Sequence, residues 1–307
     1  QGWGDLEVTR RVAQAAEASG HAARIAWVQT EAEFRRCIDE GGFDILWSAL
    51  YHISPNERFI GRNDEGTWVA DVLDERGLPY IGSDSKTMRD MIDKSATHAI
   101  LARAGVPVPG NRCLRSGDPL SGVRFPAFVK PVNESRSVGI NEDSVVEDEP
   151  ALRRQVAWIE QQFAQPALVE DFLPGQEYTA LVLGNGSDRE CLPGRVGVEE
   201  RLYGRHRILR ADMRGVGLTR VTPAGDQDQA VREIAGRAAQ AMGCLDHVRI
   251  DVKEGADSHL RILEVNRPVA LRGRHAHRLP VHQVGGRVHE VNPARGGADL
   301  QVQPAVR

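Results

Sequence analysis

Arg249-Ile250-Asp251-Val252 is a stretch in which polar and apolar residues alternate, and Leu263-Glu264-Val265-Asn266 repeats the pattern shortly afterwards. Alternation with a period of two predicts a β-strand for each stretch, with a turn near residues 255–258 between them. In such a hairpin the side chains of Asp251, Glu264 and Asn266 converge on one face, because residues two apart on a strand point the same way. Arg249 shares that face.

This polar face has the chemistry of a magnesium site. Two carboxylates and an amide oxygen are hard ligands, and Mg²⁺ typically takes one or two carboxylates together with nucleotide phosphates. Arg249 adds a cation that suits a negatively charged intermediate. Taken alone, a surface hairpin with solvated charges explains the same residues more simply, so the interpretation depends on the rest of the chain.

The bulk properties narrow the class of protein. The chain of 307 residues is long enough for two or three modules. Its net charge of −4 argues against binding to nucleic acid or to a membrane surface. No apolar run approaches a membrane span, and no secretory pattern is present. The four cysteines are scattered, as expected of free thiols in a reducing compartment. We therefore expect a cytoplasmic protein without nucleic-acid or membrane partners.

The first hundred residues alternate between helical and strand-like patterns, which predicts a parallel sheet covered by helices. We expect helices over 6–18, 31–40, 66–76 and 87–104, and strands over 24–29, 43–49 and after 77–82. A doubly wound sheet normally has a strand before its first helix. That strand is missing here, so we expect it to have been lost or to lie outside this sequence.

Lys130 ends an apolar strand over 126–131, and residues 132–140 form a loop of small and polar residues. A lysine beside such a loop makes a phosphate clamp from an ammonium group and backbone N–H donors. The pattern differs from a Walker loop, and a plain hairpin turn explains it equally well. Lys94, on the last helix of the first part, is on its own a solvated surface charge.

Further strands and helices follow the clamp loop. We expect a helix over 151–163, strands over 167–173 and 176–183, a basic loop over 199–214 and a helix over 230–242. A series of short motifs also follows in a fixed order along the chain. In that order they are Tyr80-Ile81-Gly82-Ser83, Asp93-Lys94, Gly105-Val106-Pro107-Val108-Pro109, Val129-Lys130-Pro131, residues 134–139, residues 169–179, Arg249-Ile250-Asp251 and Leu263-Glu264-Val265-Asn266. In this order and spacing they resemble the ATP-grasp superfamily, most closely the D-alanine–D-alanine ligase family.

This resemblance implies an α/β fold, α+β in its C-terminal part, with the three subdomains of the ATP-grasp architecture. Residues 1–83 would form an N-terminal parallel α/β domain. Residues 84–170 would form the central subdomain. Residues 171–307 would form the C-terminal subdomain, with an atypical tail from about 267, and ATP would lie between the last two.

The resemblance also assigns roles around the nucleotide. Lys94 and Lys130 would contact the ATP phosphates, and the backbone of Asp171 and Leu173 would form the adenine hinge. Glu170 lies beside that hinge as a further ATP contact. A last residue, Glu177, would hold the ribose hydroxyls.

The remaining roles concern metal and chemistry. Asp251, Glu264 and Asn266 would bind two Mg²⁺ ions, with Mn²⁺ as an alternative. The guanidinium of Arg249 would stabilise the acyl-phosphate and the tetrahedral intermediate. Glu7 would bind the ammonium group of the first amino acid, and Ser137 is a further catalytic candidate.

The implied reaction is the ATP-dependent joining of a carboxylate to an amine through an acyl-phosphate, with D-alanyl-D-alanine for peptidoglycan as the default product. Both steps place negative charge on oxygens, where metal ions and cations supply most of the stabilisation. The substrates would be small amino acids, and family habit suggests a homodimer. Residues 134–140 and 199–217 are the candidate lids that exclude water.

The chain departs from the family pattern in three places. The loop after Lys130 carries a bulky Arg136 after Ser135, where the family usually has small residues (Gly, Ala or Ser). Arg136 would be an extra phosphate contact, or would equally indicate a different amino acid or a carboxylated substrate. The segment 199–217 lacks the family's lysine, for which an arginine at 205, 207, 210 or 214 would substitute. After Asn266, the tail 267–307 lacks the expected substrate loop and closing helix, and looks like a diverged or frame-shifted sequence.

These departures keep two other interpretations open. One is an amino-acid ligase of secondary metabolism with a different substrate pair, and the other is a non-catalytic ATP-binding remnant. A remnant would have no reason to retain all the residues to which the resemblance assigns ATP and metal roles. The sequence leaves the amino-acid pair, its stereochemistry and the oligomeric state undecided.

Overall fold

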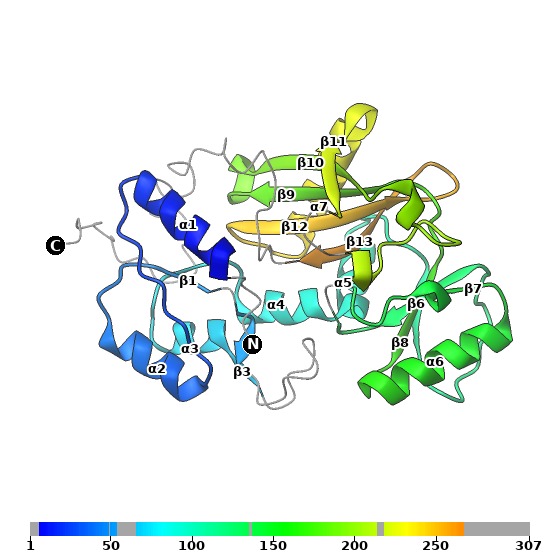
Figure 1. The fold of residues 1–307 in the computed structure, drawn as a ribbon, viewed down its shortest axis with the longest axis horizontal. Coiled ribbons are helices and arrows are strands. Elements are labelled where there is room, and N and C mark those ends of the chain that lie inside the picture. Colours follow the sequence, from blue (N-terminus) through cyan, green and yellow to red (C-terminus); the bar gives the residue numbers. More distant parts are fainter. Residues whose placement is uncertain (1–5, 49, 54–65, 135–136, 214–217, 267–307) are drawn as a thin grey trace.

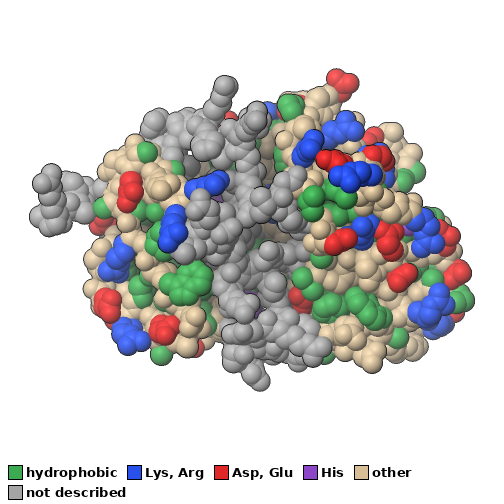
Figure 2. All heavy atoms as spheres, in the orientation of Figure 1, with side chains coloured by type: hydrophobic (Ala, Val, Ile, Leu, Met, Phe, Trp, Pro, Cys, Tyr) green, Lys and Arg blue, Asp and Glu red, His purple; other side chains and the backbone are tan. Residues whose placement is uncertain are grey.

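The computed structural model describes residues 6–48, 50–53, 66–134, 137–213 and 218–266. The first part of the chain consists of helices and two short two-stranded sheets, and two larger antiparallel sheets with their helices follow (Figure 1). Basic and acidic side chains are interspersed on the face drawn in Figure 2. Among the residues described, no helix has both the length and the apolar character needed to cross a membrane.

The N-terminal part consists of short strands and helices around a small core of Phe34, Ile38, Val72, Leu73 and neighbouring apolar side chains. Strands β1 and β4 pair in parallel, and β2 and β3 pair in antiparallel fashion. The elements are α1 (Leu6–Ala18), α2 (Glu31–Glu40), β1 (Leu46–Trp47), β2 (His52–Ile53), β3 (Thr67–Trp68), α3 (Val69–Glu75) and β4 (Tyr80–Ile81).

Three strand predictions in this part were wrong. The strand expected after residues 77–82 lies within that stretch, as β4. Residues 24–29 belong to no strand, and the strand expected over 43–49 is reduced to β1. A strand needs a partner for its backbone groups, and within the described residues 24–29 pair with none. Ile25 and Trp27 are accordingly exposed, at 39% and 61%.

The single helix expected over 87–104 is two helices, α4 (Ser85–Ile92) and α5 (Lys94–Arg103). Asp93 lies between them in an extended conformation, and its side chain accepts hydrogen bonds from the backbone N–H groups of Ser95 and Ala96. It is therefore the N-cap of α5. The break makes Lys94 the first residue of α5, and its own N–H donates to the carbonyl of Val132 (3.2 Å).

We expect Asp93→Ala to lower the free energy of unfolding by about 1 kcal/mol, because two N–H groups at the start of α5 lose their acceptor. Urea denaturation followed by circular dichroism measures this change. Asp90→Ala is the matched control: it removes only the exposed pair with Lys86 (2.8 Å) and should cost less than about 0.5 kcal/mol. Equal stabilities of the two variants would contradict the capping role.

The central part is a four-stranded antiparallel sheet in the order β5-β8-β6-β7. Its strands are β5 (Asn111–Leu114), β6 (Ala127–Pro131), β7 (Val145–Val146) and β8 (Ala167–Asp171). Helix α6 (Glu149–Phe163) packs on one face through Leu152, Val156 and Ile159 (Figure 1). Lys130 stands near the end of β6, as the sequence predicts.

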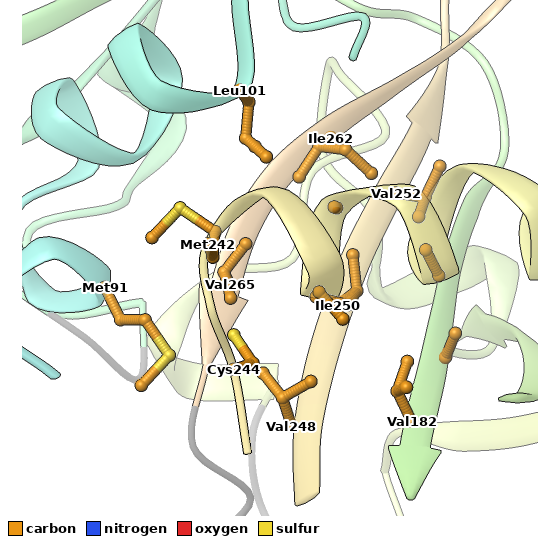
Figure 3. Close-up of a cluster of buried hydrophobic side chains, with 14 of the residues drawn as sticks. Met91, Leu101, Val182, Met242, Cys244, Val248, Ile250, Val252, Ile262 and Val265 are labelled. Atoms are coloured by element: carbon orange, nitrogen blue, oxygen red, sulfur yellow. The ribbon is translucent and has the colours of Figure 1, made fainter. Parts of the chain in front are cut away.

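The C-terminal part is a five-stranded antiparallel sheet in the order β11-β10-β9-β12-β13. Its strands are β9 (Glu177–Leu183), β10 (Glu190–Gly197), β11 (Arg220–Pro223), β12 (His247–Glu254) and β13 (Leu260–Asn266). Helix α7 (Asp228–Ala241) covers one face, and Figure 3 shows Ile250, Val252, Ile262 and Val265 in the core beneath it. Burying these residues directs the polar residues between them to the opposite face.

Helices α4 and α5 share this core through Met91 and Leu101 (Figure 3). They thus pack with the five-stranded sheet, although the expected division assigns them to the central subdomain. The boundaries after 83 and 170 stay predictions.

Candidate active site

The polar face of the β12–β13 hairpin brings the predicted metal ligands together. In the strand register Arg249 pairs with Asn266, and Asp251 pairs with Glu264. The Nδ2 of Asn266 lies 3.0 Å from Asp251 Oδ2 and 3.4 Å from Glu264 Oε2. On the neighbouring strand β9, the Thr179 hydroxyl donates to Asp251 Oδ1 (2.8 Å). The two carboxylates and the amide therefore form one cluster.

Arg249 is held in a defined orientation beside this cluster. Its Nε and Nη2 each lie 3.0 Å from one oxygen of Asp251, which makes a bidentate pair. The charge of Asp251 raises the pKa of Arg249 above its ordinary value. The side chain keeps 38% of its surface exposed, so a planar cation is presented at the site.

Both predicted phosphate lysines reach the same carboxylate. Lys94 Nζ lies 3.7 Å from Glu264 Oε1, and Lys130 Nζ lies 4.0 Å from that oxygen. Lys94 also donates to the carbonyl of Glu134, and Lys130 pairs with Glu170 Oε2 at 2.9 Å. Both ammonium groups are buried. Burial lowers the pKa of Lys94, and the nearby Glu264 opposes that shift.

The donor set fits a magnesium ion. No group of three or more His, Cys, Asp or Glu side chains suited to a metal occurs in the described part of the chain, so the set holds only two carboxylates. Asn266 turns its nitrogen toward both carboxylates, and a flip of this amide, which has nearly the same shape, would present oxygen instead. One amide and two carboxylate oxygens leave the remaining positions to water and phosphates, as Mg²⁺ prefers.

Some of the hinge groups predicted to contact the nucleotide already bind other parts of the protein. The Asp171 N–H donates to the Gly110 carbonyl (2.8 Å), and the Asp171 carboxylate pairs with Arg124. The hinge prediction therefore depends on the Asp171 carbonyl and on Leu173. Glu177 lies two residues before Thr179, on the face that carries Asp251, and its carboxylate is 3.5 Å from Lys253 Nζ.

Comparisons with known proteins identify relatives of this chain. A family model described as "D-ala D-ala ligase C-terminus" matches residues 115–268, about half of the chain. A D-alanine–D-alanine ligase of Gluconobacter oxydans (strain 621H) is 34% identical over 238 residues, which are 73% of this chain and 70% of that protein. The chain belongs to the D-alanine–D-alanine ligase family.

Other members of the D-alanine–D-alanine ligase family give the same result. A ligase of that name from Chromohalobacter salexigens is 30% identical over 248 residues, 76% of this chain and 74% of that protein. The solved D-alanine–D-alanine ligase from Coxiella burnetii superimposes with a TM-score of 0.58 at 18% identity, over 81% of this chain and 67% of that one.

A second solved structure, the VanG D-Ala:D-Ser ligase from Enterococcus faecalis, gives a TM-score of 0.56 at 19% identity, over 73% of this chain and 63% of that one. At these identities the two structures compare folds alone. They confirm the predicted α/β ATP-grasp fold.

Several family assignments fall on residues of which little is described. Glu7 lies in helix α1, but its side chain is outside the described part, as are Arg136, Arg214 and the tail 267–307. Ser137 is buried, at 8% exposed, with a positive φ of 59°. The roles of Glu7, Ser137 and Arg136 stay predictions.

The described part of the expected lid, residues 199–213, contacts the turn before β7 and the five-stranded sheet. Arg210 pairs with Glu142 beside β7, and the N–H of Arg205 donates to the same carboxylate (3.3 Å). From the five-stranded sheet, Lys253 donates to the carbonyl of Arg207 (2.9 Å). The segment therefore connects the turn before β7 with the five-stranded sheet. Which arginine replaces the family's lysine stays a prediction.

His98 was not among the predicted site residues, and it lies between Leu263 on β13 and Glu170 on β8. Its ring is 1% exposed, its Nε2 is 3.2 Å from the carbonyl oxygen of Leu263, and its Nδ1 is 3.6 Å from Glu170 Oε1. The available indication was its position one helical turn after Lys94, among the apolar residues of the helix. Burial lowers the pKa of His98, against the opposing charge of Glu170.

This shift predicts a pH dependence of stability. Because the pKa of folded His98 lies below its ordinary value of 6.5, the unfolded chain takes up the proton first. This contribution to the free energy of unfolding is present above pH 6.5 and is lost as the pH falls below 6.5 toward the folded pKa of His98. We expect the free energy of unfolding to drop less between about pH 7.5 and about pH 5.5 in His98→Gln than in the wild type, because glutamine does not titrate.

His259→Gln is the control for replacing an exposed histidine by glutamine, since the side chain of His259 is 80% exposed. The same pH dependence in wild type and His98→Gln would contradict the lowered pKa.

Proposed function

We propose that this chain is an ATP-dependent ligase that joins two molecules of D-alanine through an acyl-phosphate. Membership of the D-alanine–D-alanine ligase family supports the reaction class. The observation that carries the proposal is the convergence on Glu264: two lysine ammonium groups lie within 4.0 Å of its Oε1, and Asn266 contacts its Oε2. A solvated surface hairpin has no need to bring buried cations from two other elements to one carboxylate.

In the first step a substrate carboxylate attacks the γ-phosphorus of ATP, forming the acyl-phosphate as ADP leaves. Lys94 and Lys130 would hold the phosphates as that bond breaks, and their burial strengthens each contact by excluding water. Mg²⁺ bound by Asp251, Glu264 and Asn266 would neutralise phosphate charge. We predict two Mg²⁺ ions, which would share the protein ligands and the ATP phosphate oxygens between them.

In the second step the amine attacks the acyl carbon, the C–N bond forms, and phosphate leaves with the electrons of the C–O bond. The amine loses a proton in the process. Negative charge develops on the acyl oxygen in the tetrahedral intermediate. Arg249, oriented by its two contacts with Asp251, would stabilise that charge.

Phosphate release from ATP in the presence of Mg²⁺ tests the proposal across a panel of D- and L-amino acids. Release with D-alanine alone is the expected result. Release only with another pair would replace the substrate assignment, and saturable ATP binding without release would make the chain a non-catalytic binder. The homodimer implied by the resemblance and the cytoplasmic location expected from the bulk properties stay predictions.

A further inference from the structure

A β-bulge lies immediately beside the candidate metal ligands. In the β12–β13 ladder Asp251 pairs with Glu264 and Val252 pairs with Ile262, so Leu263 is opposite no residue. An extra residue of this kind leaves the regular ladder. The Leu263 carbonyl instead lies 3.2 Å from Nε2 of His98. Because a carbonyl only accepts, Nε2 must carry the hydrogen in this bond.

The opposite edge of the same ring faces the other sheet. His98 Nδ1 is 3.6 Å from Glu170 Oε1 on β8, and the second oxygen of Glu170 is 2.9 Å from Lys130 Nζ on β6. With the hydrogen on Nε2, Nδ1 of the neutral ring has none to donate, so at 3.6 Å the ring and the carboxylate are in packing contact rather than hydrogen-bonded. His98, Glu170 and Lys130 are 1%, 2% and 3% exposed, so water does not compete for these positions.

Helix α5 thereby contacts site residues of both the four-stranded and the five-stranded sheet. It does so through two residues one turn apart. Lys94 and His98 are four positions apart and share one side of the helix. Lys94 reaches Glu264 and the carbonyl of Glu134, while His98 reaches Leu263 and Glu170. One helix therefore carries a phosphate-binding candidate and a bridge between the sheets.

We propose that His98 is a positioning residue: by bridging the Leu263 bulge and the Glu170 carboxylate, it sets the separation between Lys130 and Glu264 in the nucleotide site. The inference rests on the proposed function, in which those two residues hold the phosphates and the metal. The competing explanation is that the ring only fills volume in the core. The two explanations differ in one expectation. Only a positioning role requires that a side chain long enough to donate to the Leu263 carbonyl keep the nucleotide affinity.

The test compares three replacements of His98 in the full chain. Leu fills similar volume without a donor, Gln can still reach Leu263 with an amide N–H, and Asn is too short for that contact. We expect Leu and Asn to weaken the binding of Mg²⁺-ATP about tenfold, equivalent to about 1.4 kcal/mol, and Gln to stay within about threefold of wild type. The KM for ATP should rise in parallel, while the KM for D-alanine should not change.

Leu101→Val is the control for a loss of packing, because Leu101 lies on the same helix, is fully buried and faces the core under α7. It should lower the melting temperature and leave nucleotide affinity unchanged. Wild-type affinity in the Leu variant, or equal affinities in the Gln and Asn variants, would overturn the proposal. The Gln and Asn pair decides the question if the Leu variant does not fold.

Calorimetry with Mg²⁺ and ADP separates this inference from the proposed reaction. If wild type releases no phosphate with any amino acid, the ligase proposal fails, and the order of nucleotide affinities still tests His98. If wild type binds no nucleotide at all, both proposals fail.

Discussion

Glu264→Gln abolishes phosphate release and leaves the fold intact. The carboxylate is the meeting point of Lys94, Lys130 and Asn266, so the neutral amide removes a negative charge that lies within 4.0 Å of both buried ammonium groups. It also removes an anionic ligand from the candidate metal site. We expect kcat to fall at least about a thousandfold, at the upper end of the effect of removing one electrostatic group from an active site. Phosphate release with D-alanine and Mg²⁺ measures it.

The control for this variant makes the same chemical change outside the site. Glu190 is exposed on β10, and Glu190→Gln should leave turnover unchanged. Thermal unfolding followed by circular dichroism shows whether Glu264→Gln remains folded. Undiminished turnover in the folded variant would remove the metal assignment.

Lys130→Met has the second large effect, and it acts on both folding and binding. Lys130 and Glu170 are almost fully buried and lie 2.9 Å apart, so Met leaves a carboxylate without its cation. We expect the free energy of unfolding to fall by about 3–5 kcal/mol. The affinity for Mg²⁺-ATP should fall about a hundredfold, because a phosphate contact in a site without water is lost.

A second variant separates the two effects. Lys130→Met combined with Glu170→Gln no longer buries an unpaired charge, so it should recover most of the stability and none of the nucleotide affinity. Lys86→Met is the surface control: this exposed lysine pairs with Asp90 at the surface, and its loss should cost less than about 1 kcal/mol. Wild-type nucleotide affinity in the double variant would show that Lys130 is no phosphate contact.

Much of the active-site face could be predicted from the sequence because strand periodicity is a local property. Two stretches of alternating residues place Asp251, Glu264, Asn266 and Arg249 on one face wherever the hairpin packs, and the structure pairs them accordingly. The apolar residues between them bury against α7, which leaves the polar residues no other face. The order of the motifs along the chain was also sufficient to predict the family.

Other features could not be predicted, because they depend on distant partners. Residues 24–29 have a strand-like composition, and a strand forms only where another backbone pairs with it. The apolar pattern continues through Asp93, so it gives no sign that a capping side chain ends one helix there and begins another. The bulge at Leu263 likewise interrupts an alternation that looks regular in the sequence.

By itself the sequence determined which residues share a face of the β12–β13 hairpin and which family the chain resembles. Only the tertiary structure decided that Lys94 and Lys130 meet on Glu264, and that His98 lies between Leu263 and Glu170. The physical reason is the range of the interactions. Alternation along a strand follows from the backbone of neighbouring residues, whereas a buried charge is tolerated only where another part of the chain supplies its partner.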